Sequence, residues 1–210
     1  MKKTYIGIAF IVLVFGIWAV PKIVNSVSPK ELLKFEKVPP FSFTNQHIKT
    51  IDNNDLEDKV YVLEFFFTSC PTICKDMQQS MLKLQDEFFG NPNFAIVSIT
   101  IDPKRDTPQK LQQYANENGV KLKNWYFLTG NKDTIYNFAN NGFKLYAAEN
   151  EAEPGGFEHS GMFALIDKNG FIRSRTVMAG EYENPLKYYD GLDAEQVQML
   201  KEDIAILLKE

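Results

Sequence analysis

The sequence predicts an α/β domain in which a central mixed sheet is flanked by helices. Residues 60–67 and 94–101 are two runs of β-branched and aromatic side chains, and each is followed by a helical pattern of apolar residues. A Lys-Asn-Gly hairpin signal at residues 168–170 joins two further apolar runs, and residues 192–208 form a last amphipathic segment. Strands that alternate with helices in this way are typical of a sheet covered on both faces.

The N-terminal segment differs from the rest of the chain. After a positively charged start, residues 5–20 are apolar apart from two glycines, a length of roughly 24 Å as a helix, which is short for a membrane span but tolerable. No small-x-small cleavage site follows, and Trp18 with Lys22 resembles an interfacial end. We therefore expect residues 1–22 to be a transmembrane anchor rather than a cleaved signal peptide, with the remaining chain exported.

One domain follows the predicted anchor. Residues 23–40 are polar and charged and end in two prolines, so we expect a tether there, and residues 41–210 are expected to form the domain. An apolar content of 44% supports a real core for a chain of 210 residues. A net charge of -4 without a dense basic cluster excludes nucleic acid as a partner.

Local signals place the elements of this domain in order. Apolar residues at spacings of three and four predict a helix from residue 73 to 88, with Met77 and Met81 as core residues rather than copper ligands. Asp106-Thr107-Pro108 predicts a capped helix start. The remaining expectations are a short hairpin within 41–51, a strand over 125–128, a helix over 134–140, an acidic loop over 144–158, strands over 162–167 and 171–177, and a helix over 192–208.

The only two cysteines, Cys70 and Cys74, follow the first buried run directly. Pro71 suits a first helical position, which would make Cys70 the N-cap and place Cys74 one turn later on the same face. The two sulfurs could then form a bridge or bind one metal ion. A strand that leads to a cysteine pair at a helix N-terminus predicts a thioredoxin-like fold, with an unrelated doubly wound domain as the alternative.

The chemistry of the pair depends on its surroundings. In an exported protein a structural disulfide is the plain interpretation, but a bridge between residues so close in sequence would stabilise the fold little. A thiol at a helix N-terminus has a lowered pKa, and thiolate is the form needed both for disulfide exchange and for metal binding. Two thiolates suit Cu(I), or zinc with further ligands.

A third ligand can come from only two histidines, His47 and His159. His47 lies in a polar segment and is expected at the surface. His159 directly precedes the strand at 162–167, and in a thioredoxin-like fold the loop before this strand lies beside the cysteine helix. Cys70, Cys74 and His159 would form a trigonal copper site, whereas zinc would lack its usual fourth ligand.

Four segments together resemble the Sco/SenC family. They are residues 67–74, with both cysteines, and residues 98–108, 125–130 and 159–167, and the resemblance runs from about residue 40 to the C-terminus. Proteins of this family are membrane-anchored, thioredoxin-fold copper proteins that help to assemble the binuclear copper centre of cytochrome c oxidase. The resemblance implies that Cys70, Cys74 and His159 occupy the family's copper-ligand positions.

The chain departs from the family pattern at Thr72, Lys75 and Glu158, where an acidic residue, a proline and an aspartate are common. None of these departures removes a ligand, and the first two make the site less negative, which favours thiolate. Asp102, Arg105 and Asp106 match the family segment; we interpret them as a turn and a helix cap rather than as a contact for a partner.

Two functions remain open at this point. The first is a copper metallochaperone, with the copper-bearing subunit of cytochrome c oxidase as its partner and a copper donor or a thiol-disulfide reductase as further partners. The second is an enzyme, a membrane-anchored thiol-disulfide oxidoreductase that uses the Cys70, Cys74 pair. The Cys-x3-Cys spacing and the absence of a proline before Met162 favour metal binding, and a peroxiredoxin fits poorly. Either protein would lie at the inner (cytoplasmic) membrane as a single-pass protein with its domain on the periplasmic side.

Overall fold

The computed structural model describes residues 13, 15, 16 and 31–210, and the folded unit spans Leu32–Glu210. The predicted anchor over residues 1–22 lies outside the described residues apart from 13, 15 and 16. In the part of the chain that is described, none of the helices has the length and apolar character needed to cross a membrane.

The elements of the folded unit alternate much as the sequence predicts. In chain order they are β1 (Leu33–Lys37), β2 (Ser42–Asn45), β3 (Thr50–Asp52), η1 (Asn53–Leu56), β4 (Val60–Phe66), α2 (Cys74–Glu87), β5 (Phe94–Thr100), α3 (Pro108–Glu117), β6 (Trp125–Thr129), α4 (Lys132–Asn137), η2 (Phe138–Phe143), β7 (Ala147–Glu149), β8 (Phe157–His159), β9 (Met162–Ile166), β10 (Phe171–Ser174), β11 (Thr176–Ala179), β12 (Tyr182–Pro185), β13 (Tyr189–Asp190) and α5 (Ala194–Leu207).

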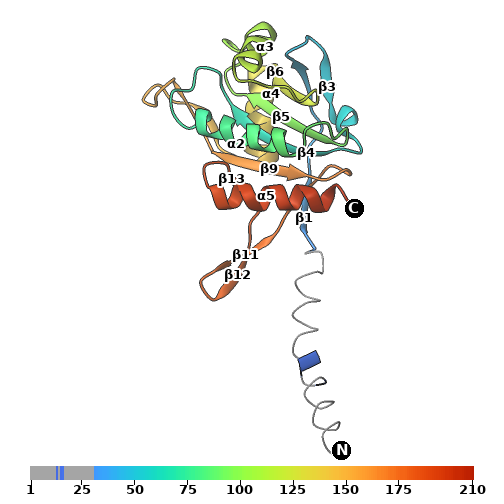
Figure 1. The fold of residues 1–210 in the computed structure, drawn as a ribbon. Coiled ribbons are helices and arrows are strands. Elements are labelled where there is room, and N and C mark those ends of the chain that lie inside the picture. The colour runs from blue at the N-terminus through green and yellow to red at the C-terminus, as the bar shows by residue number, and fades with distance from the viewer. Residues whose placement is uncertain (1–12, 14, 17–30) are drawn as a thin grey trace, which may run out of the picture. The chain divides into compact units, whose positions relative to one another are not determined.

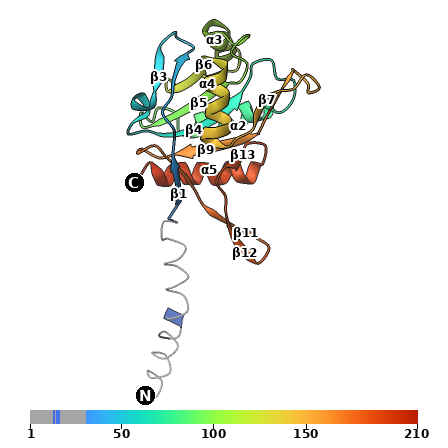
Figure 2. The ribbon, with the colours of Figure 1, turned by 180° about the vertical axis from the view of Figure 1, so that it is seen from behind.

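The central sheet is mixed and covered on both faces, as predicted. Its strands follow the order β1-β10-β9-β4-β5-β6-β2-β3, with β13 paired to β9, and the β4–β5 and β5–β6 pairs are parallel whereas the others are antiparallel. Helices α2 and α5 lie on one face and α4 crosses the other (Figures 1 and 2). Coverage on both faces explains why every residue of β4 and β5 is buried.

The register of the two central strands determines where the loops meet. Strand β4 pairs with β5 residue by residue, from Val60 opposite Phe94 to Phe66 opposite Thr100. The carboxyl ends of these parallel strands therefore lie at the same edge of the sheet. The cysteine loop that follows β4 and the turn that follows β5 consequently emerge side by side.

Three segments differ from the predictions made from the sequence. Strand β1 lies within the segment predicted as a tether, because Leu32 and Val38 at its ends are buried and the strand pairs with β10. The predicted acidic loop over 144–158 contains the hairpin β7–β8, with Ala147 opposite His159. The predicted strand over 171–177 ends at Ser174 as β10, and the chain continues into a second hairpin, β11–β12, which projects from the body (Figure 1).

Helix α4 also differs from its prediction. It ends at Asn137 and continues without a break as the π-helical turn η2. The helical segment therefore runs past residue 140, where the predicted helix ends, and includes Asn141 and Gly142, a pair typical of turns. The turn buries Phe138 and Phe143, and both rings pack edge-on against Phe65 of β4. Aromatic packing against the sheet outweighs the local turn signal at this point.

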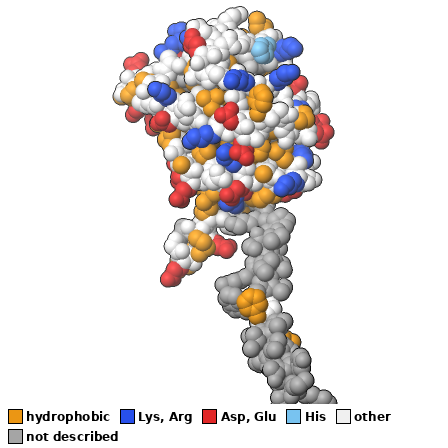
Figure 3. Space-filling model, in the orientation of Figure 1, with side chains coloured by type: hydrophobic (Ala, Val, Ile, Leu, Met, Phe, Trp, Pro, Cys, Tyr) orange, Lys and Arg blue, Asp and Glu red, His pale blue; other side chains and the backbone are white. Residues whose placement is uncertain are grey.

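The charges on the surface are mixed. Lys and Arg alternate with Asp and Glu over the face shown in Figure 3, and no region of that face carries a broad basic patch. This distribution agrees with the net charge of -4.

Candidate metal centre

The two cysteines lie on opposite sides of a helix start. Helix α2 begins at Cys74 with Ile73 as its N-cap, so the prediction that Cys70 caps the helix is wrong. Cys70 instead lies in a loop whose first turn is closed by a hydrogen bond from the Cys70 amide to the Phe67 carbonyl. Cys74 is only 4% exposed, whereas Cys70 is half-buried and reaches the surface.

His159 comes from a different part of the chain and lies directly against Cys74. It is the last residue of β8, and its Nε2 lies 3.1 Å from the Cys74 Sγ. Its Nδ1 lies 3.0 Å from the Ser160 carbonyl, which can only accept, so Nδ1 carries the proton and donates it. Nε2 is therefore left with a free lone pair that points at the thiol, the arrangement typical of a metal-binding histidine.

The three donor atoms fit a single small metal ion. The Cys70 Sγ, the Cys74 Sγ and a ring nitrogen of His159 all lie within 4.8 Å of one another. Donors bound to one ion at roughly 2.0–2.3 Å can be at most about 4.5 Å apart, so a small closure of these atoms would complete the site. Two sulfurs and one imidazole are soft and intermediate ligands that suit copper in a trigonal site.

The two thiols have very different pKa values. The hydrogen bond from Cys74 is the main cause that lowers the pKa of Cys70 to about 3, and further hydrogen bonds from Thr72 act in the same direction. The same interaction with Cys70, together with burial, raises the pKa of Cys74. Cys70 is thus the more exposed thiolate and Cys74 the buried thiol. The sequence predicts the lowered pKa of Cys70, but its main cause is the neighbouring thiol and not a helix terminus.

A small cavity opens beside the donor atoms. It measures about 150 Å³ and is lined by Phe67, Cys70, Thr72, Ile73, Glu153, Phe157, Glu158 and His159. The cavity gives solvent, a metal ion or a partner's ligand a route to Cys70 and His159. Glu153 and Glu158 of the β7–β8 hairpin contribute carboxylates to its lining, and Phe67, Ile73 and Phe157 contribute apolar side chains.

Aromatic packing connects the hairpin to the cysteine loop. The Phe67 ring, which is almost fully buried, packs edge-on against the His159 ring with centroids 5.8 Å apart, and it contacts the Phe157 ring at 5.2 Å. Phe67 directly precedes the loop that carries Cys70. The His159 ring therefore packs against Phe67, the residue from which the cysteine loop starts.

A buried carboxyl group lies on β4 below the site. Glu64 is 2% exposed, accepts a hydrogen bond from the Ser98 hydroxyl, and Trp125 in turn donates to that hydroxyl. Burial raises the pKa of Glu64 to about 7, against the opposing effect of the bond from Ser98. Sequence reasoning missed this residue because a single glutamate in an apolar strand gives no separate signal.

The structure brings together Cys70, Cys74 and His159, which were the predicted ligands. His47 is exposed on the turn between β2 and β3, as expected, and Met77 and Met81 are fully buried core residues. The turn at Asp102 is also present, but Thr107 caps helix α3, and the carboxylate of Asp106 binds Thr68 and Thr100 instead. Sequence reasoning missed this link between the turn and the cysteine loop.

Comparisons with known proteins agree with this geometry. The family described as SCO1/SenC matches residues 29–188. The SCO1 protein homolog of Bacillus subtilis is 34% identical over 145 residues, which cover 68% of this chain and 74% of the relative.

Solved structures of related proteins have the same fold. A SCO1/SenC family lipoprotein from Bacillus anthracis is similar with a TM-score of 0.72 at 28% identity, over 86% of this chain and 99% of the other. A second structure, of BsSco, described as a member of the Sco family of cytochrome c oxidase assembly proteins with a disulfide switch, gives a TM-score of 0.70 at 28% identity, over 86% and 98%.

Proposed function

The chain belongs to the SCO1/SenC family, and on this premise we propose that it is a copper metallochaperone in the assembly of cytochrome c oxidase. The observation that carries the proposal is the convergence of two cysteine sulfurs and one histidine nitrogen within 4.8 Å, from two segments that lie 85 residues apart in sequence. The related BsSco is described as belonging to a family of assembly proteins for this oxidase.

The site is suited to hold copper and to release it. Cys70 supplies a thiolate that is already ionised, while Cys74 releases its proton when copper binds, so binding is coupled to proton release. Three ligands leave Cu(I) open to a fourth donor from a partner. Copper can then pass to the copper-bearing subunit of the oxidase by exchange of one ligand at a time.

The exposure of the ligands sets an order for that exchange. Cys70 borders the cavity and is partly exposed, whereas Cys74 is buried behind it. A thiolate or imidazole of the partner would therefore replace Cys70 first and Cys74 last. The same site can take Cu(II), because the imidazole is a good ligand for both oxidation states.

A second function, thiol-disulfide exchange, is favoured by the low pKa of Cys70. Its exposed thiolate would attack one sulfur of a partner's disulfide and form a mixed disulfide, with the other partner sulfur leaving as thiolate. Cys74, once deprotonated, would then attack Cys70 and release the second partner thiolate. The partner gains two electrons, and Cys70 and Cys74 end as a disulfide, so such a step would prepare a partner to receive copper.

We also place the domain outside the cytoplasm, held by an anchor over residues 1–22 and a tether that ends before β1. The apolar run at residues 5–20 supports this, and the related Bacillus anthracis protein is described as a lipoprotein. Mass spectrometry of protein extracted from inner membranes tests the anchor. An intact N-terminus is expected, and a mature N-terminus near residue 20 would contradict it.

Copper titration of the reduced full-length chain in detergent tests the main function. Wild type is expected to bind one copper ion tightly, with a large loss of affinity in Cys70→Ser, Cys74→Ser and His159→Ala, while His47→Ala serves as the matched control and binds as wild type does. If His159→Ala binds copper as tightly as wild type while the reduced protein rapidly reduces disulfides, the oxidoreductase function replaces the chaperone function.

A further inference from the structure

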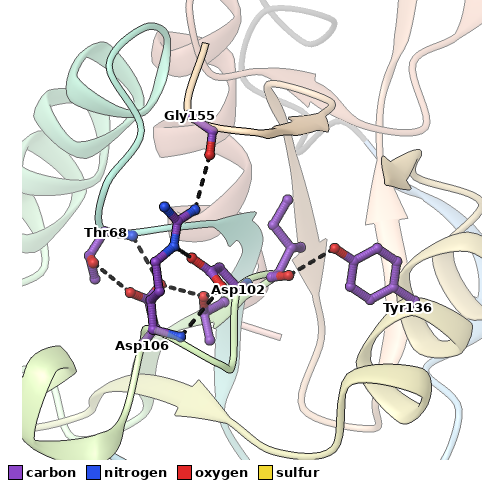
Figure 4. Close-up of polar contacts among 8 residues, drawn as sticks. Thr68, Asp102, Asp106, Tyr136 and Gly155 are labelled. Atoms are coloured by element: carbon purple, nitrogen blue, oxygen red, sulfur yellow. Dashed lines mark hydrogen bonds and ion pairs between the residues drawn. The ribbon is translucent and has the colours of Figure 1, made fainter. Parts of the chain in front are cut away.

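The turn between β5 and α3 contacts both halves of the metal centre (Figure 4). Asp106 is fully buried, and its carboxylate accepts a hydrogen bond from the Thr68 amide at 3.0 Å and another from the Thr68 hydroxyl. Thr68 lies two residues before Cys70. Asp106 therefore fixes the start of the cysteine loop to the neighbouring strand end.

Arg105, the residue before Asp106, reaches in the other direction. Its Nη2 donates a hydrogen bond of 3.0 Å to the Gly155 carbonyl in the β7–β8 hairpin, 50 residues further along the chain. Its guanidinium carbon lies 5.2 Å from the centre of the Phe157 ring, at a distance suited to a cation-π contact. Phe157 begins strand β8, and His159 ends it.

The orientation of Arg105 is determined by Asp102. The carboxylate of Asp102 is almost fully buried and pairs with Nε of Arg105, which leaves Nη2 free to bind the hairpin. Fork-shaped donors of this kind hold a fixed direction better than a single ammonium group does. A turn with a helix cap would not need the bond to Gly155, so the turn alone does not account for this residue.

The hairpin rests closely on the cysteine loop at the same place. Gly155 has φ +89°, and a Cβ added to it would lie 2.9 Å from a ring carbon of Phe67 and 3.1 Å from Cδ of Pro71. Phe67 and Pro71 enclose the segment that leads to Cys70. Gly155 is thus a point at which the backbone of the histidine-bearing hairpin lies close against side chains that flank Cys70.

We propose that Arg105 is a positioning residue for His159, which holds the β7–β8 hairpin against the cysteine loop so that the imidazole faces the two sulfurs. This inference deepens the proposed copper function and rests on it. Arg105 touches none of the donor atoms and acts only through Gly155 and Phe157.

A double-mutant cycle tests whether Arg105 acts through His159. In the full-length chain, Arg105→Ala is expected to weaken copper binding roughly tenfold, measured by competition with a chelator. In the His159→Ala background the same change is expected to cause no further loss, because the ligand that Arg105 positions is already absent. Lys104→Ala, which removes a neighbouring exposed positive charge, is the matched control and is expected to bind copper as wild type does.

The cycle also defines what would overturn the inference. A wild-type affinity in Arg105→Ala, or a tenfold loss that persists in the His159→Ala background, would show that Arg105 does not act through the histidine. If the wild-type chain itself does not bind copper, the proposed function is refuted instead. Hydrogen exchange of the metal-free chain still tests the positioning role in that case, since Arg105→Ala is expected to speed exchange at residues 147–160 and unchanged exchange would refute it.

A pair of glycine variants tests the same contact without disturbing Asp102. Gly155 and Gly156 both have positive φ, of +89° and +85°, but a Cβ on Gly156 would meet no atom within 4 Å. Both alanine variants carry the same backbone strain, so a difference between them reports the close approach to Phe67 and Pro71. Gly155→Ala is expected to weaken the nitrogen coupling in the electron paramagnetic resonance spectrum of the Cu(II) form, and Gly156→Ala to retain it. Equal spectra would overturn the inference.

Discussion

The metal centre combines two regions that are held in place very differently. Strand β4 and helix α2, which carry the cysteines, belong to the continuous core: Met77, one turn after Cys74, is fully buried, as are most residues of β4. The β7–β8 hairpin, which carries His159, is a short two-stranded ribbon with exposed acidic residues. It is attached through Gly155 and Phe157 and through two hydrogen bonds between Ala147 and Asn140. The sulfurs are thus part of the fold, whereas the imidazole is brought to them by a few contacts.

A core substitution should have the largest effect on folding and little effect on the hairpin. Met77→Ala removes a fully buried side chain below Cys74 and is expected to lower the free energy of unfolding by about 2–5 kcal/mol. Urea denaturation of the metal-free chain measures this. Copper binding by the fraction that remains folded should stay close to that of wild type.

The contrasting variant is Phe157→Ala in the hairpin. Phe157 is partly exposed, so its removal is expected to lower the free energy of unfolding by less than about 2 kcal/mol but to weaken copper binding, since Phe157 joins Phe67 to Arg105. If Met77→Ala and Phe157→Ala change stability and copper affinity in the same proportion, the two regions form one cooperative unit and the contrast between them is wrong.

The next effect in size concerns Glu64, the buried carboxyl group of the core region. Its pKa of about 7 in the folded protein lies above that of an exposed glutamate, so the folded state binds the proton more tightly than the unfolded state. The resulting stabilisation is full below about pH 4 and is lost as the pH rises through about 7, by on the order of 3 kcal/mol.

Glu64→Gln tests this pH dependence. The amide remains uncharged and can still accept the hydrogen bond from Ser98, so the variant is expected to gain stability relative to wild type between pH 5 and pH 8. Denaturant unfolding of both proteins at the two pH values measures the difference. A difference between the proteins that is the same at pH 5 and pH 8 would show that Glu64 does not titrate in this range.

The last prediction concerns the reactivity of the two thiols, and it is expected to have the smallest effect on folding. With its pKa lowered to about 3, Cys70 should be alkylated by iodoacetamide at nearly the same rate from pH 8 to pH 5, whereas an ordinary thiol slows by about tenfold per pH unit. Peptide mass spectrometry should find Cys70 modified before Cys74. Cys74→Ala should restore a steep pH dependence, because it removes the hydrogen-bond donor that is the main cause of the low pKa. A steep dependence in wild type would contradict the assignment.

The prediction from sequence was most successful where a long pattern determines an element. The runs that became β4 and β5, and the helical spacing that became α2, each involve many residues that face the core. The sequence also singled out the two cysteines and the histidine that the structure brings together, because cysteine and histidine are rare in this chain. The order of these elements was sufficient to predict the mixed sheet.

Prediction failed where a few tertiary contacts decide the structure. Strand β1 forms because Leu32 and Val38 are buried next to β10, and its polar sequence does not show this. The sequence predicts Cys70 as the N-cap of α2, whereas the helix begins at Cys74 with Ile73 as its N-cap. The cysteine loop before it is held by Asp106, which binds Thr68 across 38 residues of sequence. The role of Arg105 depends on a hydrogen bond to the backbone carbonyl of Gly155. Every residue type has such a carbonyl, so the sequence at this position does not indicate the bond.

The position of Cys70 outside helix α2 has a consequence for the range of distances that the two sulfurs can adopt. On a helix, residues four apart keep a nearly constant separation, whereas a disulfide needs its sulfurs about 2.05 Å apart and two ligands of one metal ion lie considerably further apart. Because one cysteine begins the helix and the other lies in the preceding loop, the loop can lengthen or shorten this separation while the helix stays in place. Under the proposed function, the same two sulfurs lie close together in an oxidised form and further apart around a metal ion.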